Sequence, residues 1–206
     1  MMDEYFKSLG IINLGNTSRI RAWLDTVSLH LYKLNKFAAR VETRTDLELN
    51  QLSPESEDIL FSIRHGFNPG MLHWCFRGPA LMQFFDDWNE VHNQITSLAG
   101  ESRFNLPSII YSNSHIFRHK DRRLAAVNVG LYHSDKSCNL YWEGRKLVAW
   151  HNIDDNEAIA MRVYETDHSV TQDDNKSGMM WPRAILTWDM MTPYEDIVSR
   201  FNSKKT

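Results

Sequence analysis

Residues 106–132 read LPSIIYSNSHIFRHKDRRLAAVNVGLY, and this stretch decides the fold class. Two apolar runs rich in Ile, Val and Tyr flank a polar segment, a composition typical of strands. Further runs of the same kind follow, namely CNLYW (138–142), KLVAW (146–150), AIAMRVYE (158–165) and RAILTW (183–188). The second half of the chain is therefore predicted to be mostly antiparallel strands, with a tight hairpin at Glu143-Gly144.

The sequence before this stretch has the three- and four-residue periodicity of amphipathic helices. A first helix is expected after the cap-like Asn16-Thr17-Ser18, and a second from Ser53 to Gly66. The apolar face of a third runs from Leu81 to Leu98 and ends at Gly100. A last short helix is expected to open at Thr192-Pro193-Tyr194-Glu195, which has the form of a capping box.

Helices first and strands second, without βαβ alternation, indicate an α+β fold. We expect a double-stranded β-helix (jelly roll) with an N-terminal helical half packed on it. One domain would span residues 1–206, with 1–105 as helical support and 106–206 as the jelly-roll core. The loop-like segment Gly66–Pro79 is expected either to cover a pocket mouth or simply to pack on the core.

Composition indicates a packed domain, since 42% of the 206 residues are hydrophobic and 12% are aromatic. The net charge of −3 gives no reason to expect a nucleic-acid partner. The chain shows neither a signal-peptide pattern nor an apolar run long enough for a membrane helix, so a soluble, cytoplasmic protein is expected. Cys75 and Cys138 are expected to be free thiols.

His119 and Asp121 form a His-x-Asp pair directly after a strand-like run. Residues two apart on a strand point to the same side, so both side chains can be directed at one point. His168, on another strand, would complete a set of three. Two imidazoles and one carboxylate suit Fe(II) and leave three coordination positions open, whereas the lack of thiolates argues against structural zinc.

Other histidines compete for this role. A second His-x-Asp pair, His133 and Asp135, lies in a polar run that is expected to form a turn. His151 precedes an acidic turn and is expected to be solvated. His168 itself could instead be a hydrogen-bonded histidine of the core.

Arg183 opens the apolar strand AILTW, where an inward-pointing charge would need a partner. A guanidinium at the end of a pocket can hold a dicarboxylic acid through paired hydrogen bonds. Ile185 and Thr187 would then share its face, and Thr187 could add a hydroxyl contact. The alternative is an arginine that reaches solvent or Asp189.

The order and spacing of His119, Asp121, His168 and Arg183 resemble the Fe(II)/2-oxoglutarate-dependent dioxygenases. The chain is most similar to the small prolyl-hydroxylase-like and aspartyl/asparaginyl-hydroxylase-like oxygenases of phages and bacteria. The resemblance covers about residues 107–200, whereas the helical half matches no motif. Its further counterparts are Ala126-Val127-Asn128, the Tyr141-Trp142 strand and His168-Ser169-Val170.

This resemblance implies that Fe(II) binds His119, Asp121 and His168, and that Arg183 holds the 2-oxoglutarate cosubstrate. By analogy Asn128 and Tyr111 would contact the cosubstrate, although both could be plain sheet residues. The implied reaction couples oxidative decarboxylation of 2-oxoglutarate to succinate and CO2, using O2, with oxidation of a substrate. Retention of the carboxylate favours hydroxylation, because related halogenases lack it.

The substrate would be a small molecule or a side chain of a protein or peptide, and the sequence gives neither its identity nor the oligomeric state. One basic cluster departs from the simplest family pattern, and it comprises Arg118, Lys120, Arg122 and Arg123. These side chains either lie at a solvated strand edge or attract an anionic group of the substrate. The main alternative function is a cupin-type metal or small-molecule binding domain without 2-oxoglutarate chemistry. A further alternative is an interaction protein whose histidines are structural.

Overall fold

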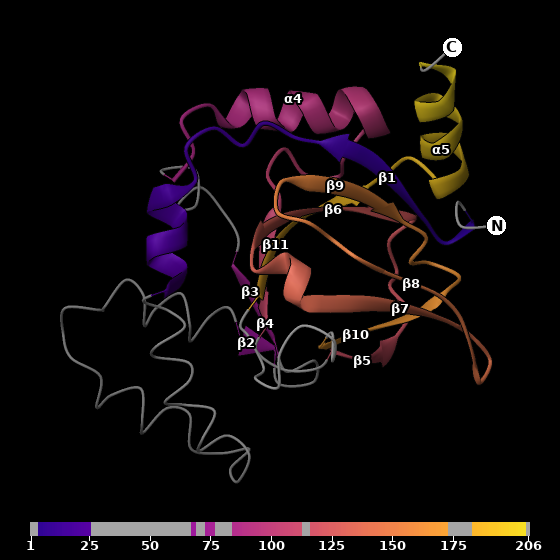
Figure 1. The fold of residues 1–206 in the computed structure, drawn as a ribbon. Coiled ribbons are helices and arrows are strands. Elements are labelled where there is room, and N and C mark those ends of the chain that lie inside the picture. Colours follow the sequence, from indigo (N-terminus) through magenta and orange to yellow (C-terminus); the bar gives the residue numbers. More distant parts are fainter. Residues whose placement is uncertain are drawn as a thin grey trace, which may run out of the picture.

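Two antiparallel sheets face each other in the computed structural model, which describes residues 4–25, 67–68, 73–76, 84–112, 116–172 and 183–204 (Figure 1). The larger sheet has the order β1 (Phe6–Ile11), β9 (Glu157–Met161), β6 (Ala125–Tyr132), β11 (Arg183–Met190), β4 (Ser108–Ser112), β3 (His73–Phe76) and β2 (Phe67–Asn68). The smaller has the order β5 (Ile116–His119), β10 (Asp167–Gln172), β7 (Ser137–Glu143) and β8 (Lys146–Asn152). Every strand pair is antiparallel, as expected for a β-sandwich of the jelly-roll type.

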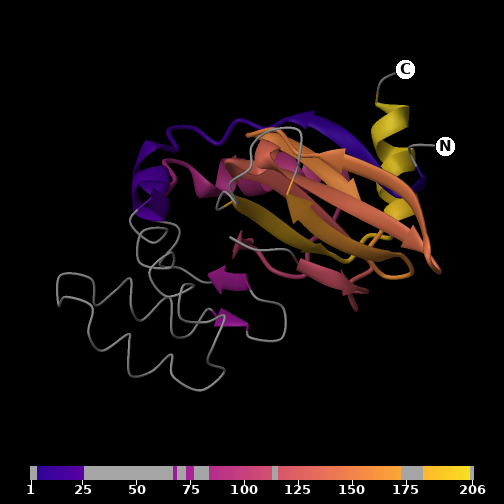
Figure 2. The same ribbon diagram turned by 60° about the horizontal axis from the view of Figure 1, so that its bottom comes forward.

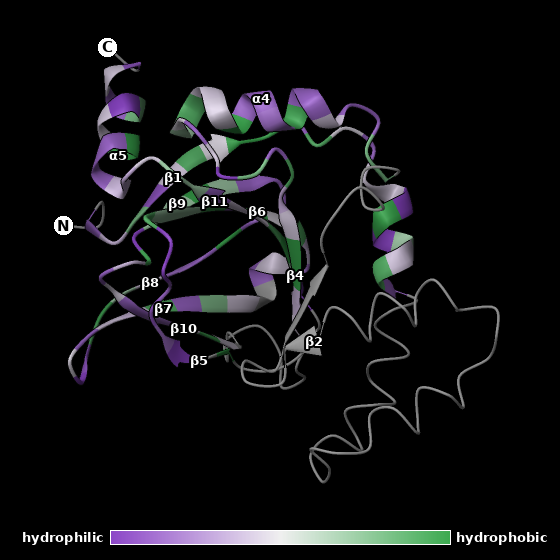
Figure 3. Ribbon diagram, turned by 180° about the vertical axis from the view of Figure 1, so that it is seen from behind, coloured by the Kyte–Doolittle hydropathy of each residue, from purple (hydrophilic) through white to green (hydrophobic). Residues whose placement is uncertain are grey.

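The larger sheet separates two apolar layers. Its outer face packs against α4 (Trp88–Ala99) and α5 (Tyr194–Ser203), which lie on the side away from the smaller sheet (Figures 1 and 2). Helix α4 shows hydrophilic and hydrophobic bands along its length (Figure 3), and it buries Trp88, Val91 and Ile95 against this face. A smaller cluster, which includes Ile159 and Tyr141, fills part of the space between the sheets.

The predicted third helix is confirmed at its end but begins later than expected. The Asp87 carboxylate accepts a hydrogen bond from the backbone N–H of Glu90 at 2.9 Å, so the helix begins at Trp88. Phe85 lies before the helix and packs edge-on against Trp88, with ring centroids 4.3 Å apart. At the other end Gly100 has φ of 92°, and a Cβ there would collide with Oγ1 of Thr192.

The last helix is confirmed, but its capping box is not. Helix α5 begins at Tyr194, and its N-cap residue Pro193 makes no side-chain cap bond. The Thr192 hydroxyl instead accepts a hydrogen bond from the backbone N–H of Glu101 at 3.1 Å. The predicted cap residue therefore joins the segment after α4 to the segment before α5.

The N-terminal half is not purely helical. Strand β1 pairs with β9 from Phe6 to Ile11, so residues assigned to the helical support are part of the larger sheet. A helical segment is present at this point, over residues 18–25, and the rest of the predicted first helix lies outside the described residues. The predicted helix Ser53–Gly66 also lies outside them, whereas part of the Gly66–Pro79 segment forms β2 and β3.

Two other strand predictions differ in outcome. The hairpin at Glu143-Gly144 is confirmed, because β7 pairs with β8 across that turn. The run AIAMRVYE was expected to be strand through Glu165, but β9 ends at Met161. The chain then turns and forms β10, which carries His168. Within the described part of the chain, no helix has the length and apolar character needed to span a membrane.

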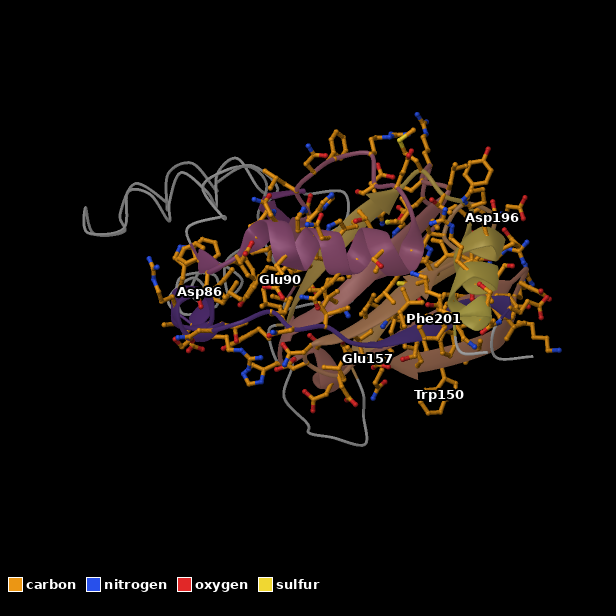
Figure 4. The ribbon with its side chains drawn as sticks, turned by 90° about the horizontal axis from the view of Figure 1, so that it is seen from above. Asp86, Glu90, Trp150, Glu157, Asp196 and Phe201 are labelled. Atoms are coloured by element: carbon orange, nitrogen blue, oxygen red, sulfur yellow. The ribbon has the colours of Figure 1, made fainter. Side chains whose placement is uncertain are left out.

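His151 is buried, which corrects the expectation that it is solvated. Strand β8 extends past Trp150 to Asn152, and the strand alternation turns His151 inward while Trp150 points out at the edge of the molecule (Figure 4). The His151 ring stacks on Phe6 with centroids 4.0 Å apart. Neither ring nitrogen has a hydrogen-bond partner among the described residues. This burial, with a smaller effect of the Arg183 charge, lowers the pKa of His151 to about 3.

Replacement of His151 by Phe should therefore make stability less sensitive to acid. The histidine binds a proton below its ordinary pKa of 6.5 in the unfolded state but stays neutral in the fold down to about pH 3. Its contribution is thus fully present above pH 6.5 and is lost as the pH falls toward 3. Between pH 7.5 and pH 5 the native protein should lose about 2 kcal/mol more unfolding free energy than His151→Phe. Urea titrations at both pH values measure this, and equal losses would contradict it.

Candidate active site

A cavity of about 950 Å³ lies between the two sheets and is lined by residues from both. Strand β11 supplies one wall, and the alternation of its side chains explains why. Four of its residues line the cavity, namely Arg183, Ile185, Thr187 and Asp189. The intervening four pack in the core beneath the helices, namely Ala184, Leu186, Trp188 and Met190. Ile185 and Thr187 thus share the face of Arg183, as predicted.

His119, Asp121 and His168 come together at this cavity. His119 is the last residue of β5 and pairs directly with His168 on β10. The Nε2 atom of His119 lies 3.7 Å from Oδ1 of Asp121, and the Nε2 atom of His168 lies 3.8 Å from Oδ2. One ligand atom from each residue can be chosen so that all three lie within 4.8 Å of one another.

The reason for this convergence differs in part from the prediction. Asp121 does not share a strand with His119, because β5 ends at His119 and Asp121 lies in the following loop. The loop is held instead by the backbone N–H of Asp121, which donates to the carbonyl of Val163 at 3.0 Å. The two-residue period of a strand therefore does not explain why Asp121 lies beside His119.

The protonation states of these groups suit a cation. Burial, with a smaller effect of the neighbouring His119 imidazole, lowers the pKa of His168 to about 4, so His168 is neutral at pH 7. Its Nδ1 lies 3.3 Å from the carbonyl oxygen of Thr166. Because a carbonyl can only accept, Nδ1 carries the hydrogen and Nε2 keeps its lone pair facing Asp121.

Asp121 is ionised for a different reason. Burial alone would raise its pKa, but the charge and hydrogen bonds of Arg123, together with the two histidines, outweigh this effect. The pKa of Asp121 therefore lies below its ordinary value. At neutral pH the cluster presents a carboxylate and the neutral imidazole of His168.

Arg183 lies in the cavity wall and is 3% exposed. Its Nε donates to the hydroxyl of Ser112 at 3.3 Å and its Nη1 to the hydroxyl of Ser137 at 2.9 Å. Burial lowers its pKa to about 10, so the guanidinium remains charged at pH 7. Among the described residues no Asp or Glu forms an ion pair with it, and Asp189 instead lies 3.6 Å from Arg103.

The remaining predicted residues divide into two groups. Asn128 and Thr187 line the cavity. Asn128 Nδ2 donates to the Met161 sulfur at 2.9 Å, and its Oδ1 has no partner among the described residues. Tyr111, in contrast, is fully buried in the core beneath the helices and does not line the cavity. Strand alternation turns it away from Ser108 and Ile110, which argues against a cosubstrate contact by Tyr111.

Neither competing histidine lies at the cavity. His133 has φ of 47° and precedes the short 3-10 helix η4 (Ser134–Lys136), so the second His-x-Asp pair lies in a turn, as predicted. His151 is buried against Phe6, where it does not line the cavity. The spacing of the sequence motif alone did not separate these sites, whereas the strand context did.

Sequence reasoning missed the roles of three residues that make contacts in the site. Ser112 and Ser137 bind Arg183, but no local pattern marks a serine that becomes a partner only when β4 and β7 are in place. Arg123 was noted only as part of a basic cluster, yet it binds Asp121 and Thr187. Its position two residues after Asp121 was the available signal.

Comparisons with known proteins show fold likenesses of low score. No family model and no curated protein matches the sequence. Solved structures with some similarity include a Pseudomonas putida prolyl-4-hydroxylase, with TM-score 0.42, 12% identity, and coverage of 91% of this chain and 94% of that one. A prolyl hydroxylase from Trichoplax adhaerens, in complex with a hypoxia inducible factor oxygen degradation domain peptide fragment, has TM-score 0.29 and 16% identity over 45% of each chain.

A third similar structure is a Burkholderia pseudomallei oxidoreductase of the 2OG-Fe(II) oxygenase family, with TM-score 0.33 and 14% identity over 48% of each chain. This chain thus spans less than half of two of the three proteins. These values are too low to assign the chain to a family.

Replacement of Arg183 by Met should leave the ligand-free protein as stable as before or raise its unfolding free energy by about 1 kcal/mol. The reason is that a buried charge with no counter-charge among the described residues costs desolvation energy that an apolar side chain of similar length avoids. Chemical denaturation without added ligands measures this. Ile185→Ala is the control, with an expected loss of about 2–4 kcal/mol. A loss above about 2 kcal/mol for Arg183→Met would make Arg183 a structural residue.

Proposed function

We propose that this protein is an Fe(II)- and 2-oxoglutarate-dependent dioxygenase of the hydroxylase type, formed as one domain by residues 1–206. The support is that one cavity joins two features with different chemistry. The first is the cluster of His119, Asp121 and His168, and the second is the buried charge of Arg183. A ligand that bridges them needs a metal-binding end and an anionic end, as 2-oxoglutarate has.

The observation that carries this proposal is that the buried guanidinium of Arg183 has no carboxylate partner among the described residues. A charge as buried as that of Arg183 normally has a carboxylate partner, because burial without one is costly. The two serine hydroxyls accept hydrogen bonds but contribute no negative charge. A carboxylate from the cosubstrate would supply the missing charge and could bind the planar group through paired hydrogen bonds.

The donor set fits Fe(II). Two imidazoles and one carboxylate, without thiolate, are the set that non-haem Fe(II) oxygenases use, and it leaves three positions open. Cys138 is buried and outside the cavity lining. Two ligand atoms on one ion at about 2.1 Å can lie at most about 4.2 Å apart. The 3.7 Å between Nε2 of His119 and Oδ1 of Asp121 falls within that limit.

In this proposal His119, Asp121 and His168 hold the metal. Bound Fe(II), with 2-oxoglutarate and O2, would supply the oxidation that converts 2-oxoglutarate to succinate and CO2 and oxidises the substrate. The protein orients the cosubstrate through Arg183, whose guanidinium is fixed by Ser112 and Ser137. Apolar side chains of the wall limit the access of water to the reacting groups, and they include Ile110, Ile116, Val163, Val170 and Ile185.

The remaining volume is available for the oxidised substrate. A cavity of about 950 Å³ is at the upper end of the range for small-molecule sites, so it has room for more than 2-oxoglutarate. We propose that either a small molecule or the side chain of a protein or peptide enters beside the metal cluster. Thr187 and Asn128 line the wall and are proposed to contact the cosubstrate.

Succinate formation tests the proposal. The purified protein should convert 2-oxoglutarate to succinate slowly without its own substrate, and only with Fe(II) and O2 present. His168→Ala should abolish this turnover because it removes a metal ligand. Exposed Arg122→Gln, which removes a charge outside the lining, should leave it unchanged. Metal binding without any succinate would instead support a cupin-type metal-binding domain.

Binding of 2-oxoglutarate tests the anionic end separately. The metal-loaded protein is titrated with 2-oxoglutarate in a calorimeter without O2. Arg183→Met should weaken the binding of 2-oxoglutarate at least tenfold, equivalent to about 1.4 kcal/mol or more. Metal affinity should not change in this variant. Unchanged 2-oxoglutarate affinity would exclude Arg183 as the anchor.

A further inference from the structure

Arg123 makes three contacts in the cavity wall that neither metal binding nor cosubstrate binding requires of it. Its Nε donates to Oδ2 of Asp121 at 3.0 Å, and its Nη2 donates to the same oxygen. Its Nη1 donates to the hydroxyl of Thr187 at 3.0 Å. The side chain is 22% exposed, so these bonds are largely shielded from water.

These contacts treat the two oxygens of Asp121 differently. Both hydrogen bonds from Arg123 go to Oδ2, whereas Oδ1 accepts none from the described residues. Oδ1 lies 3.7 Å from Nε2 of His119, and Oδ2 lies 3.8 Å from Nε2 of His168, so the histidines alone do not select one oxygen. A carboxylate can bind a metal through one oxygen or chelate it through both, and here one oxygen already has two donors.

The third contact fixes the guanidinium in place. Thr187 is on β11, which is hydrogen-bonded to neighbours on both sides. The loop that carries Asp121 is also held through its backbone, by the bond from Asp121 to Val163. Arg123 therefore ties a loop residue to the central strand of the larger sheet, and the Asp121 carboxylate cannot turn without breaking this network.

From these contacts we propose that Arg123 is a positioning residue that restricts Asp121 to one oxygen, Oδ1, as a metal ligand. The inference rests on the proposed function, because it presumes that the cluster binds a metal. A chelating carboxylate would occupy one of the positions that a facial set of three ligands leaves open. By holding Oδ2 through its planar guanidinium, Arg123 keeps that coordination position available for the cosubstrate or O2.

Binding of Co(II) to the intact protein tests this proposal without any turnover. Cobalt is a spectroscopic substitute for Fe(II), and its visible bands report the number and type of ligands. Arg123→Gln should weaken Co(II) binding about tenfold to a hundredfold and shift the visible bands of the bound ion. Arg123→Lys keeps the charge but lacks the planar guanidinium with its paired donors, so it should show the same spectral shift.

Matched controls separate position from charge and from folding. Arg122→Gln removes an identical charge one residue away on an exposed side chain, and it should leave affinity and spectrum as in the native protein. Thr187→Val removes only the hydroxyl that holds Nη1, so it should shift the spectrum in the same direction with a smaller loss of affinity. Thr187→Val keeps the test decisive if Arg123→Gln fails to fold.

Two negative outcomes have distinct meanings. If the native protein binds Co(II) and His168→Ala abolishes this, but Arg123→Gln and Thr187→Val both retain native affinity and spectrum, the role of Arg123 is refuted and the metal site stands. If Arg123→Lys has the native spectrum, the charge of residue 123 rather than its paired hydrogen bonds controls how Asp121 binds the metal, and the proposal is also refuted. If the native protein binds no Co(II), the proposed function fails and this inference fails with it.

Discussion

The alternation of side chains along β11 is the constraint on which the site depends. The strand is hydrogen-bonded to β4 on one edge and to β6 on the other, so its register is fixed from both sides. A shift by one residue would move Arg183 into the apolar layer beneath the helices and Leu186 into the cavity. Burial of Leu186 and Trp188 under α4 and α5 opposes that shift strongly. The core on one face thus determines which groups the other face offers to a ligand.

Much of the fold could be predicted because its strands are short, apolar and separated by polar turns. The hairpin at Glu143-Gly144 and the end of a helix at Gly100 follow from local chemistry, and both are observed. Local patterns failed where pairing partners are distant in sequence. Strand β1 is defined by its register with β9, some 150 residues later, and β10 by its position between β5 and β7. Such pairings leave no periodic signal in the strand itself.

The candidate site was predictable to a similar degree and for similar reasons. The strand context distinguished His119 and Asp121, which have apolar strands on both sides, from the His133 pair, which lies in a polar turn. Tyr111 was predicted by analogy to contact the cosubstrate, but the analogy does not specify which face of β4 the side chain occupies. The structure places it on the face that packs in the core. His151 was predicted to be solvated because the strand was expected to end at Trp150, two residues before the end of β8, and strand ends are decided by tertiary pairing. The serines that bind Arg183 are apparent only after both sheets are assembled.

The two arginines of the cavity have opposite electrostatic situations, and the contrast explains what each is able to do. Arg123 is neutralised by Asp121, so its charge is used within the protein and its hydrogen bonds fix a carboxylate. Arg183 is more deeply buried and has only hydroxyl partners among the described residues. The acids that line the cavity, Asp121 and Asp189, pair with Arg123 and Arg103 instead. An anchor for an anion has to be left without a protein carboxylate, because an internal ion pair would compete with the ligand. Among the described residues, the acids around the cavity leave Arg183 without such an ion pair.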